Sequence, residues 1–200
     1  IPTIGHLEGI CHSYVDKDAN PSIAKKVILN AKLRNTAICG ATETILLHQK
    51  ILKKLGVQIL KDLAESGCKI IGDNKVRKFY KGKIQKATNK DWSKEYLSST
   101  ISAKSVKSVE EAILHINKYG TMHTDCIITQ NKKSAEKFLK GVKSSIAMHN
   151  TSTQFADGGE FGFGGEVGIS TSKLPPRGPV GLKQLVSYKY QVISKGKIRK

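Results

Sequence analysis

Apolar alternation and helix signals take turns along most of the chain, and together they predict alternating strands and helices. Short strands are expected where β-branched and apolar residues cluster. They cover residues 10–15, 44–48, 68–72, 100–106, 124–129 and 145–149. The helices between them are expected over residues 20–33, 49–66, 108–119 and 131–141. This repeat favours a mostly parallel sheet flanked by crossover helices, which is an α/β fold.

The ends of the predicted helices carry their own signals. Asn20 followed by Pro21 is typical of an N-cap and a first helical residue. Ser108 with Glu111 forms a capping box, and Gly67 is placed to end the helix that precedes it.

Three segments depart from the repeat. Residues 75–94 are basic, polar and poorly periodic, so we expect a surface excursion there. Residues 157–177 are rich in glycine and predict a long shaped loop without the GxGxxG spacing of a dinucleotide site. Residues 186–193 alternate like a last strand with an exposed edge. Such an edge favours a homodimer formed by strand addition.

Composition limits the domain count and the compartment. A chain of 200 residues with 38% hydrophobic residues can bury one core, so we expect one domain with appendages. No stretch is apolar enough to span a bilayer, and residues 1–6 lack the pattern of a signal peptide. The sequence therefore predicts a cytoplasmic protein without a membrane partner.

The formal charge of +18 raises the question of nucleic-acid binding. The lysines are scattered, however, and the aromatic residues do not alternate with them at stacking positions. A solvated, lysine-rich surface is favoured over a nucleic-acid groove, and it would concentrate anionic small molecules.

Four cysteines are present, and one of them stands out as a candidate nucleophile. They show neither a CxxC pair nor matching histidine spacing, so neither disulfides nor a metal site is expected. Cys68 and Cys126 precede apolar runs and are expected to fill the core, and Cys11 falls in another strand. Cys39 has small and polar neighbours at the start of an apolar run, where a thiol can meet a substrate carbonyl.

Seven stretches of the chain form a familiar set: residues 6–12, 35–44, 95–97, 120–125, 150–158, 165–171 and 177–182. Together they resemble the γ-glutamyl phosphate reductase family, also called glutamate-5-semialdehyde dehydrogenase, a branch of the aldehyde dehydrogenase superfamily that serves proline biosynthesis. They occur in the order of the family and cover nearly the whole chain. The resemblance implies an aldehyde-dehydrogenase-like catalytic domain corresponding to the C-terminal half of that enzyme.

The resemblance also implies a domain plan. Residues 1–9 would be the last part of a cofactor-binding domain, residues 10–182 the catalytic domain, and residues 183–200 an oligomerisation strand with a basic tail. The chain departs from the family pattern before the catalytic block, at residues 34–36, and at Pro175-Pro176, so the loops near the site are expected to differ.

The implied reaction is the reduction of L-glutamyl 5-phosphate by NADPH through a cysteine thioester. Cys39 occupies the place of the nucleophile, and because thiolates are strong nucleophiles, a positive local potential would be enough to activate its thiol. Glu95 matches the glutamate that binds the nicotinamide ribose. His6 lies where hydrolytic relatives carry the base that activates water, and its alternative is a strand-end histidine without a role.

Five further residues are candidates for substrate contacts. They are His123, Asn150, Ser152, Thr153 and Arg177. His123 is equally compatible with packing. Asn150, Ser152 and Thr153 follow a strand and would hold the amino-acid end of the substrate. Arg177 would pair with a carboxylate or phosphate, or else support the glycine-rich loop.

Three readings remain open from the sequence. The first is a reductase half that needs a separate N-terminal nucleotide-binding chain. The second is an inactive remnant or binding module with the same fold, which an unreactive Cys39 would favour. The third and least favoured is a basic nucleic-acid-binding protein.

Overall fold

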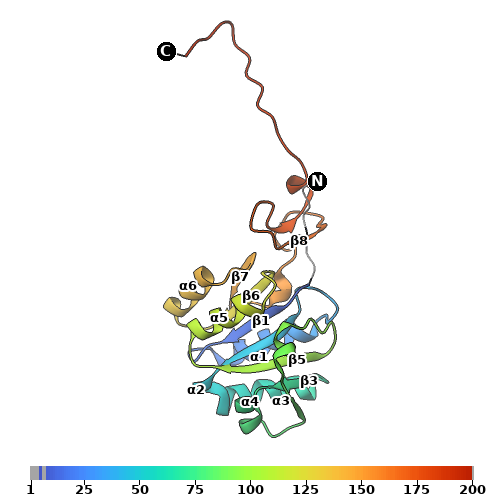
Figure 1. Cartoon of the computed structure of the whole chain (residues 1–200), viewed down its shortest axis with the longest axis vertical. Helices are drawn as coiled ribbons and strands as arrows, with labels where there is room; N and C mark the ends of the chain where they lie inside the picture. The colour runs from blue at the N-terminus through green and yellow to red at the C-terminus, as the bar shows by residue number, and fades with distance from the viewer. Residues whose placement is uncertain (1–4, 6–7, 200) are drawn as a thin grey trace.

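A computed structural model describes residue 5 and residues 8–199, and its centre is a sheet of seven parallel strands (Figure 1). The strands are β1 (Cys11–Val15), β2 (Thr42–His48), β3 (Lys69–Gly72), β4 (Ile84–Lys86), β5 (Thr100–Val106), β6 (Thr124–Ile128) and β7 (Ile146–His149). Their order across the sheet is β4-β3-β5-β2-β1-β6-β7. The predicted α/β fold with a mostly parallel sheet is therefore confirmed.

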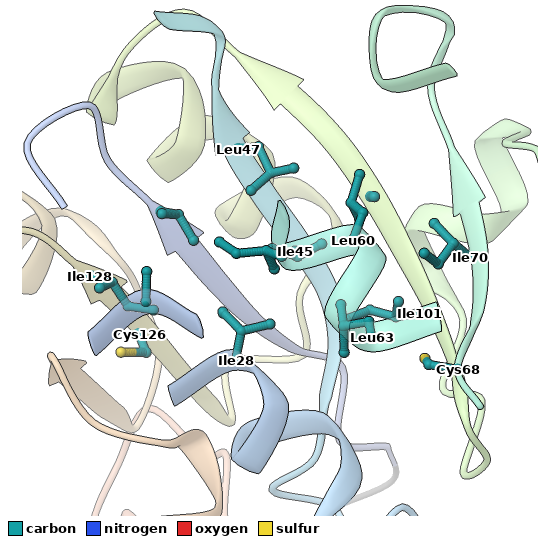
Figure 2. Packing of buried hydrophobic residues seen from close by; sticks show 14 of the residues in the cluster. Ile28, Ile45, Leu47, Leu60, Leu63, Cys68, Ile70, Ile101, Cys126 and Ile128 are labelled. Atoms are coloured by element: carbon teal, nitrogen blue, oxygen red, sulfur yellow. The ribbon is translucent and has the colours of Figure 1, made fainter. Parts of the chain in front are cut away.

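Helices cover both faces of the sheet. They are α1 (Pro21–Leu33), α2 (Gln49–Ile51), α3 (Val57–Glu65), α4 (Asn74–Phe79), α5 (Val109–Tyr119) and α6 (Lys132–Gly141). The apolar sides of α1 and α3 pack on Ile45 and Leu47 in one cluster, part of which Figure 2 shows. Those of α5 and α6 pack on Tyr14 and Leu46 in a second cluster. Alternate residues of β2 thus serve opposite faces, as the pleat of a strand requires.

The helix expected over residues 49–66 is interrupted. A π-helical turn, Leu52–Gly56, separates α2 from α3. Gly56 lies against the sheet there, and an added Cβ would stand 3.1 Å from Leu52 and 3.4 Å from Leu47. The end of the helix agrees with the sequence, because Gly67 follows it with a φ of +84°.

Residues 75–94 lie mostly at the surface, as expected, but they contain regular structure that the sequence did not indicate. This part of the chain contains α4, the edge strand β4 and a 3₁₀ turn, Asn89–Ser93. Val76, Tyr80 and Trp92 are buried, while most of the other side chains are exposed. A few apolar residues are enough to attach an edge strand whose outer side remains polar, so the segment shows no clear periodicity.

The C-terminal third differs from the sequence prediction in two ways. The glycine-rich segment contains a strand, β8 (Gly168–Ser170), which pairs antiparallel with β9 (Gly178–Val180). A 3₁₀ turn, Leu182–Gln184, follows β9. Residues 186–193 form no strand, and residues 186–199 extend away from the body of the molecule (Figure 1). An alternating segment forms a ladder only when a partner strand is available, and this chain supplies none among its described residues. Strand addition between two chains stays a prediction.

No helix in the described part of the chain has both the length and the apolar character needed to cross a bilayer.

Candidate active site

Cys39 lies in the loop between α1 and β2, at the edge of the sheet where the parallel strands begin. The loop closes in a turn in which the Ala41 N–H donates to the Ile38 carbonyl over 3.0 Å. The thiol is half-buried and lines a hollow of about 430 Å³ between the loop and the β8–β9 hairpin. Leu185 and Gly5 complete the wall of this hollow. The structure therefore places Cys39 where the sequence predicted an accessible thiol.

Glu95 is brought to Cys39 through Gly9. The Gly9 N–H donates to Glu95 Oε1 over 2.9 Å. Gly9 itself packs on Cys39, since an added Cβ would stand 2.7 Å from the Cys39 Cα and 2.8 Å from its Cβ. The Cys11 thiol donates to the Cys39 carbonyl over 3.1 Å. Two residues matched through the resemblance, 56 positions apart in the sequence, thus meet at one site.

A buried ion pair fixes the segment that follows Glu95. Lys32 of α1 and Glu43 of β2 are both fully buried, with Nζ and Oε2 separated by 2.6 Å. The other oxygen of Glu43 accepts the Leu97 N–H over 3.3 Å. Leu97 has a φ of +48°, a conformation that a side chain rarely adopts without such support. Helix, sheet and the Glu95 segment are therefore joined through one carboxylate.

The charged groups that act most on Cys39 are carboxylates, so its nearest charges do not supply the positive local potential that would favour the thiolate. Burial raises the pKa of the Cys39 thiol, and the carboxylates of Glu166 and Glu95 raise it further. The backbone N–H groups of Cys39 and Gly40 favour the thiolate and act in the opposite direction. The net charge of +18 does not predict the potential at this thiol, because nearby groups outweigh distant lysines.

The other cysteines are core residues, as predicted. Cys11 and Cys126 are fully buried, and Cys68 is 5% exposed. Burial raises the pKa of the Cys68 thiol to about 11 and that of Cys126 to about 12. The pKa of Cys11 is raised for the same reason. Cys39 is thus the only partly accessible thiol in the described part of the chain.

The replacement of Glu166 by glutamine tests this account of the thiol. The alkylation rate of Cys39 by iodoacetamide is expected to rise with pH through a midpoint above that of an ordinary thiol, because only the thiolate reacts. Removing the charge of Glu166 should move the midpoint to lower pH. Peptide mass spectrometry measures the rate at Cys39 alone. Glu160→Gln, an exposed change in the same loop, is the control, and equal midpoints in both variants would contradict the assignment.

Two of the predicted substrate residues, His123 and Asn150, form hydrogen bonds with residues in or next to the sheet strands. His123 is fully buried, with Nδ1 2.8 Å from Thr124 Oγ1 and 3.5 Å from Cys11 Sγ. Asn150, with a φ of +56°, accepts the Thr129 N–H and donates to the Thr129 carbonyl, each over 2.9 Å. It stands where β6 and β7 end, at the edge opposite Cys39. In this structure neither side chain faces the hollow beside Cys39.

The other three candidates lie at the same edge as Cys39 but are engaged in internal bonds. Ser152 accepts the Gln154 N–H at the start of a 3₁₀ turn, Thr153–Phe155. Thr153 is buried, with its hydroxyl 2.9 Å from that of Thr42. Arg177 is exposed and donates to the Lys143 carbonyl ahead of β7. This bond fits the alternative that Arg177 supports the glycine-rich loop. His6 lies outside the described residues.

Sequence reasoning missed the side chains that hold the site together. Gln154 donates to two backbone carbonyls near the end of α1, and Glu43 and Glu166 act on the Cys39 region as described above. Gln154 and Glu166 fall within matching stretches without any local pattern that marks them. Among residues 8–199, no group of three or more histidine, cysteine or acidic side chains is arranged to hold a metal ion.

The fold is shared with a known class of proteins. No family model matches the sequence. The fold is that of the aldehyde dehydrogenases: an acetylating aldehyde dehydrogenase from Geobacillus thermoglucosidasius superposes with a TM-score of 0.70 at 16% identity, covering 98% of this chain and 54% of the other. The chain therefore has the α/β fold of the aldehyde dehydrogenases, with Cys39 in the loop ahead of β2.

Two relatives narrow the class. The chain is 47% identical over 199 residues to γ-glutamyl phosphate reductase from Hyphomonas neptunium, covering 100% of this chain and 46% of the relative. The crystal structure of the Thermotoga maritima γ-glutamyl phosphate reductase superposes with a TM-score of 0.96 at 40% identity, covering 100% of this chain and 48% of the other. The resemblance drawn from the sequence is confirmed: the chain is a homologue of γ-glutamyl phosphate reductase. It spans about half the length of the relatives it matches.

Proposed function

We propose that this chain supplies the nucleophile and substrate side of a γ-glutamyl phosphate reductase acting on L-glutamyl 5-phosphate. The observation that carries the proposal is the juxtaposition of Cys39, Gly9 and Glu95 beside the hollow under the β8–β9 hairpin. The identity of the relatives supports the substrate class. In this proposal residues 10–182 are the catalytic domain, and residues 1–9 belong to the cofactor-binding part of the enzyme.

The residues present account for the first chemical step. The Cys39 sulfur forms a bond to the acyl carbon, and the bond from that carbon to the phosphate oxygen breaks, so inorganic phosphate leaves with its electron pair. The backbone N–H groups of Cys39 and Gly40 stabilise the thiolate before attack. Because the pKa of the thiol is raised, the thiolate fraction and the rate of this step increase with pH in the neutral range.

The cofactor of the proposed reaction is a nicotinamide dinucleotide, with NADPH implied by the resemblance. When bound, NADPH supplies the hydride that reduces the thioester to glutamate 5-semialdehyde and frees the thiol. Glu95 fits the ribose contact, because its carboxylate is partly exposed beside Cys39 and uses Oε1 alone for the bond to Gly9 within the described residues. The remaining cofactor contacts would come from an N-terminal nucleotide-binding part, whether in the same protein or in a separate chain.

The proposed partners are the small-molecule substrate and a second copy of the chain. Residues 183–200 are the proposed oligomerisation segment, because Tyr188, Tyr190, Val192 and Ile193 are each more than 80% exposed. An alternating apolar segment that finds no partner strand among the described residues of its own chain is suited to pairing with a strand of another.

The proposal is tested by NADPH formation from NADP, phosphate and glutamate 5-semialdehyde. The chain is assayed alone and together with the portion of the Thermotoga maritima enzyme that it does not match. Turnover that disappears in Cys39→Ser is the expected result, because no other partly accessible thiol stands at the site. The matching portion of the Thermotoga enzyme serves as the positive control. If that control restores turnover and this chain, although folded, does not, the chain is a remnant or binding module.

A further inference from the structure

The loop that carries Cys39 makes few hydrogen bonds of its own and is also held by neighbouring elements. Within residues 34–41 the Ala37 N–H bonds to Asn35 Oδ1, and the Ala41 N–H bonds to the Ile38 carbonyl. Neighbouring elements close on the loop from two sides. Gly9 packs on Cys39, and at Gly40 an added Cβ would stand 3.2 Å from the Thr153 carbonyl. The 3₁₀ turn Thr153–Phe155 is therefore one wall of the nucleophile loop.

Gln154 projects from that turn to the end of α1. Its Nε2 donates to the Ala31 carbonyl over 2.9 Å and to the Asn35 carbonyl over 3.1 Å. Its Oε1 accepts from Arg34 Nη1 over 3.2 Å. The side chain is 6% exposed, and these three bonds leave neither of its amide hydrogens free.

The two carbonyl groups that Gln154 binds lie at the end of α1 and at the start of the loop that carries Cys39. The last carbonyls of a helix have no partner within the helix, and Ala31 belongs to that last turn of α1. Asn35 begins the run of four residues that leads to Cys39. A single carboxamide therefore joins the end of the helix, the start of the loop and the turn behind Gly40.

We propose that Gln154 is a positioning residue for Cys39, which rests on the proposed role of Cys39 as the nucleophile. Gln154 does not touch the thiol. It acts through the backbone of residues 31–35, and it keeps the loop pressed between Gly9 and the 3₁₀ turn. This placement sets the burial of the thiol and its distance from Glu95. Burial, Glu166 and Glu95 all raise the pKa of Cys39.

The chemistry of the position is specific. Glutamate at position 154 would keep an acceptor for Arg34 but place a carboxylate against two carbonyl oxygens that now receive N–H donors. Methionine would fill a similar volume without any hydrogen bond. Arg34→Ala removes only the bond to Oε1 and leaves both donors in place.

The test compares Gln154→Met, Gln154→Glu and Arg34→Ala with the unchanged chain. Iodoacetamide alkylation of Cys39 is followed by peptide mass spectrometry across pH, and the melting temperature is measured in parallel. Both Gln154 variants should raise the alkylation rate at least about threefold and lower its pH midpoint, because a released loop leaves the thiol less buried. Arg34→Ala should move both quantities less, in the same direction.

A matched control separates positioning from a general loss of stability. Phe138→Leu removes packing in the cluster on the other face of the sheet. It should lower the melting temperature without changing the pH midpoint at Cys39. The proposal is overturned if the Gln154 variants change the midpoint no more than Phe138→Leu does. If a Gln154 variant fails to fold, Arg34→Ala replaces it in the comparison, and a shift of the pH midpoint no larger than that in Phe138→Leu overturns the proposal. Alkylation needs no turnover, so the outcome is independent of the assay of the proposed function.

Discussion

Replacement of Lys32 by methionine is expected to lower the free energy of unfolding by about 3–5 kcal/mol, because it leaves a buried carboxylate without its cation. Lys32 and Glu43 are both fully buried, and their charged atoms are 2.6 Å apart. Burial already raises the pKa of Glu43, and Lys32 is the main group that opposes this shift. Urea unfolding measures the loss.

The control for this prediction is the same substitution at the surface. Lys61 pairs with Glu65 over 3.6 Å, and both side chains are more than 60% exposed, so Lys61→Met should cost within about 1 kcal/mol. Adding Glu43→Gln to Lys32→Met should restore part of the stability, because the neutral amide still accepts the Leu97 N–H. A loss at Lys32 no larger than that at Lys61 would contradict the importance of the buried pair.

Replacement of Gly9 by alanine is expected to displace Cys39, the proposed nucleophile. The new Cβ would stand 2.7 Å from the Cys39 Cα, so one of the two backbones has to move. Overpacking of this kind destabilises by about 1–3 kcal/mol. Because Gly9 also carries the hydrogen bond to Glu95, turnover in the reconstituted enzyme should fall at least about tenfold.

Gly165→Ala is the matched control, since an added Cβ at Gly165 meets nothing within 4 Å and the residue does not need a positive φ. Gly165 lies in the glycine-rich segment, part of which lines the hollow beside Cys39. Its turnover and unfolding free energy should stay near those of the unchanged chain. Equal effects at Gly9 and Gly165 would mean that contact with Cys39 does not explain the sensitivity of this region.

The fold was predictable because it depends on local periodicity. The strands that form the centre of the sheet are short apolar runs, and helix starts such as Asn20 and Ser108 are marked by capping side chains. Edge strand β4 was missed, since an edge with polar residues carries little alternation. Residues 186–193 show the opposite case: they alternate well, but alternation does not supply a partner.

The site was predictable only in part. Cys39 is marked by its small neighbours, and the resemblance adds Glu95. Gln154 was not predictable, because it lies more than 100 residues from the carbonyls it binds and nothing in its local sequence distinguishes it. The acidic surroundings of the thiol were also hidden, since they depend on which carboxylates the fold brings near.

The position of the β8–β9 hairpin has a consequence for the order in which the site is made. Cys39 joins the sheet through β2, whereas most of the wall of its hollow is formed by residues 167–185, which follow it in the sequence by more than 120 positions. During synthesis the sheet can assemble while the thiol still faces open water. The hollow beside Cys39 is therefore completed only after the β8–β9 hairpin has been made, and the Cys39 thiol is exposed to oxidants until the hairpin docks.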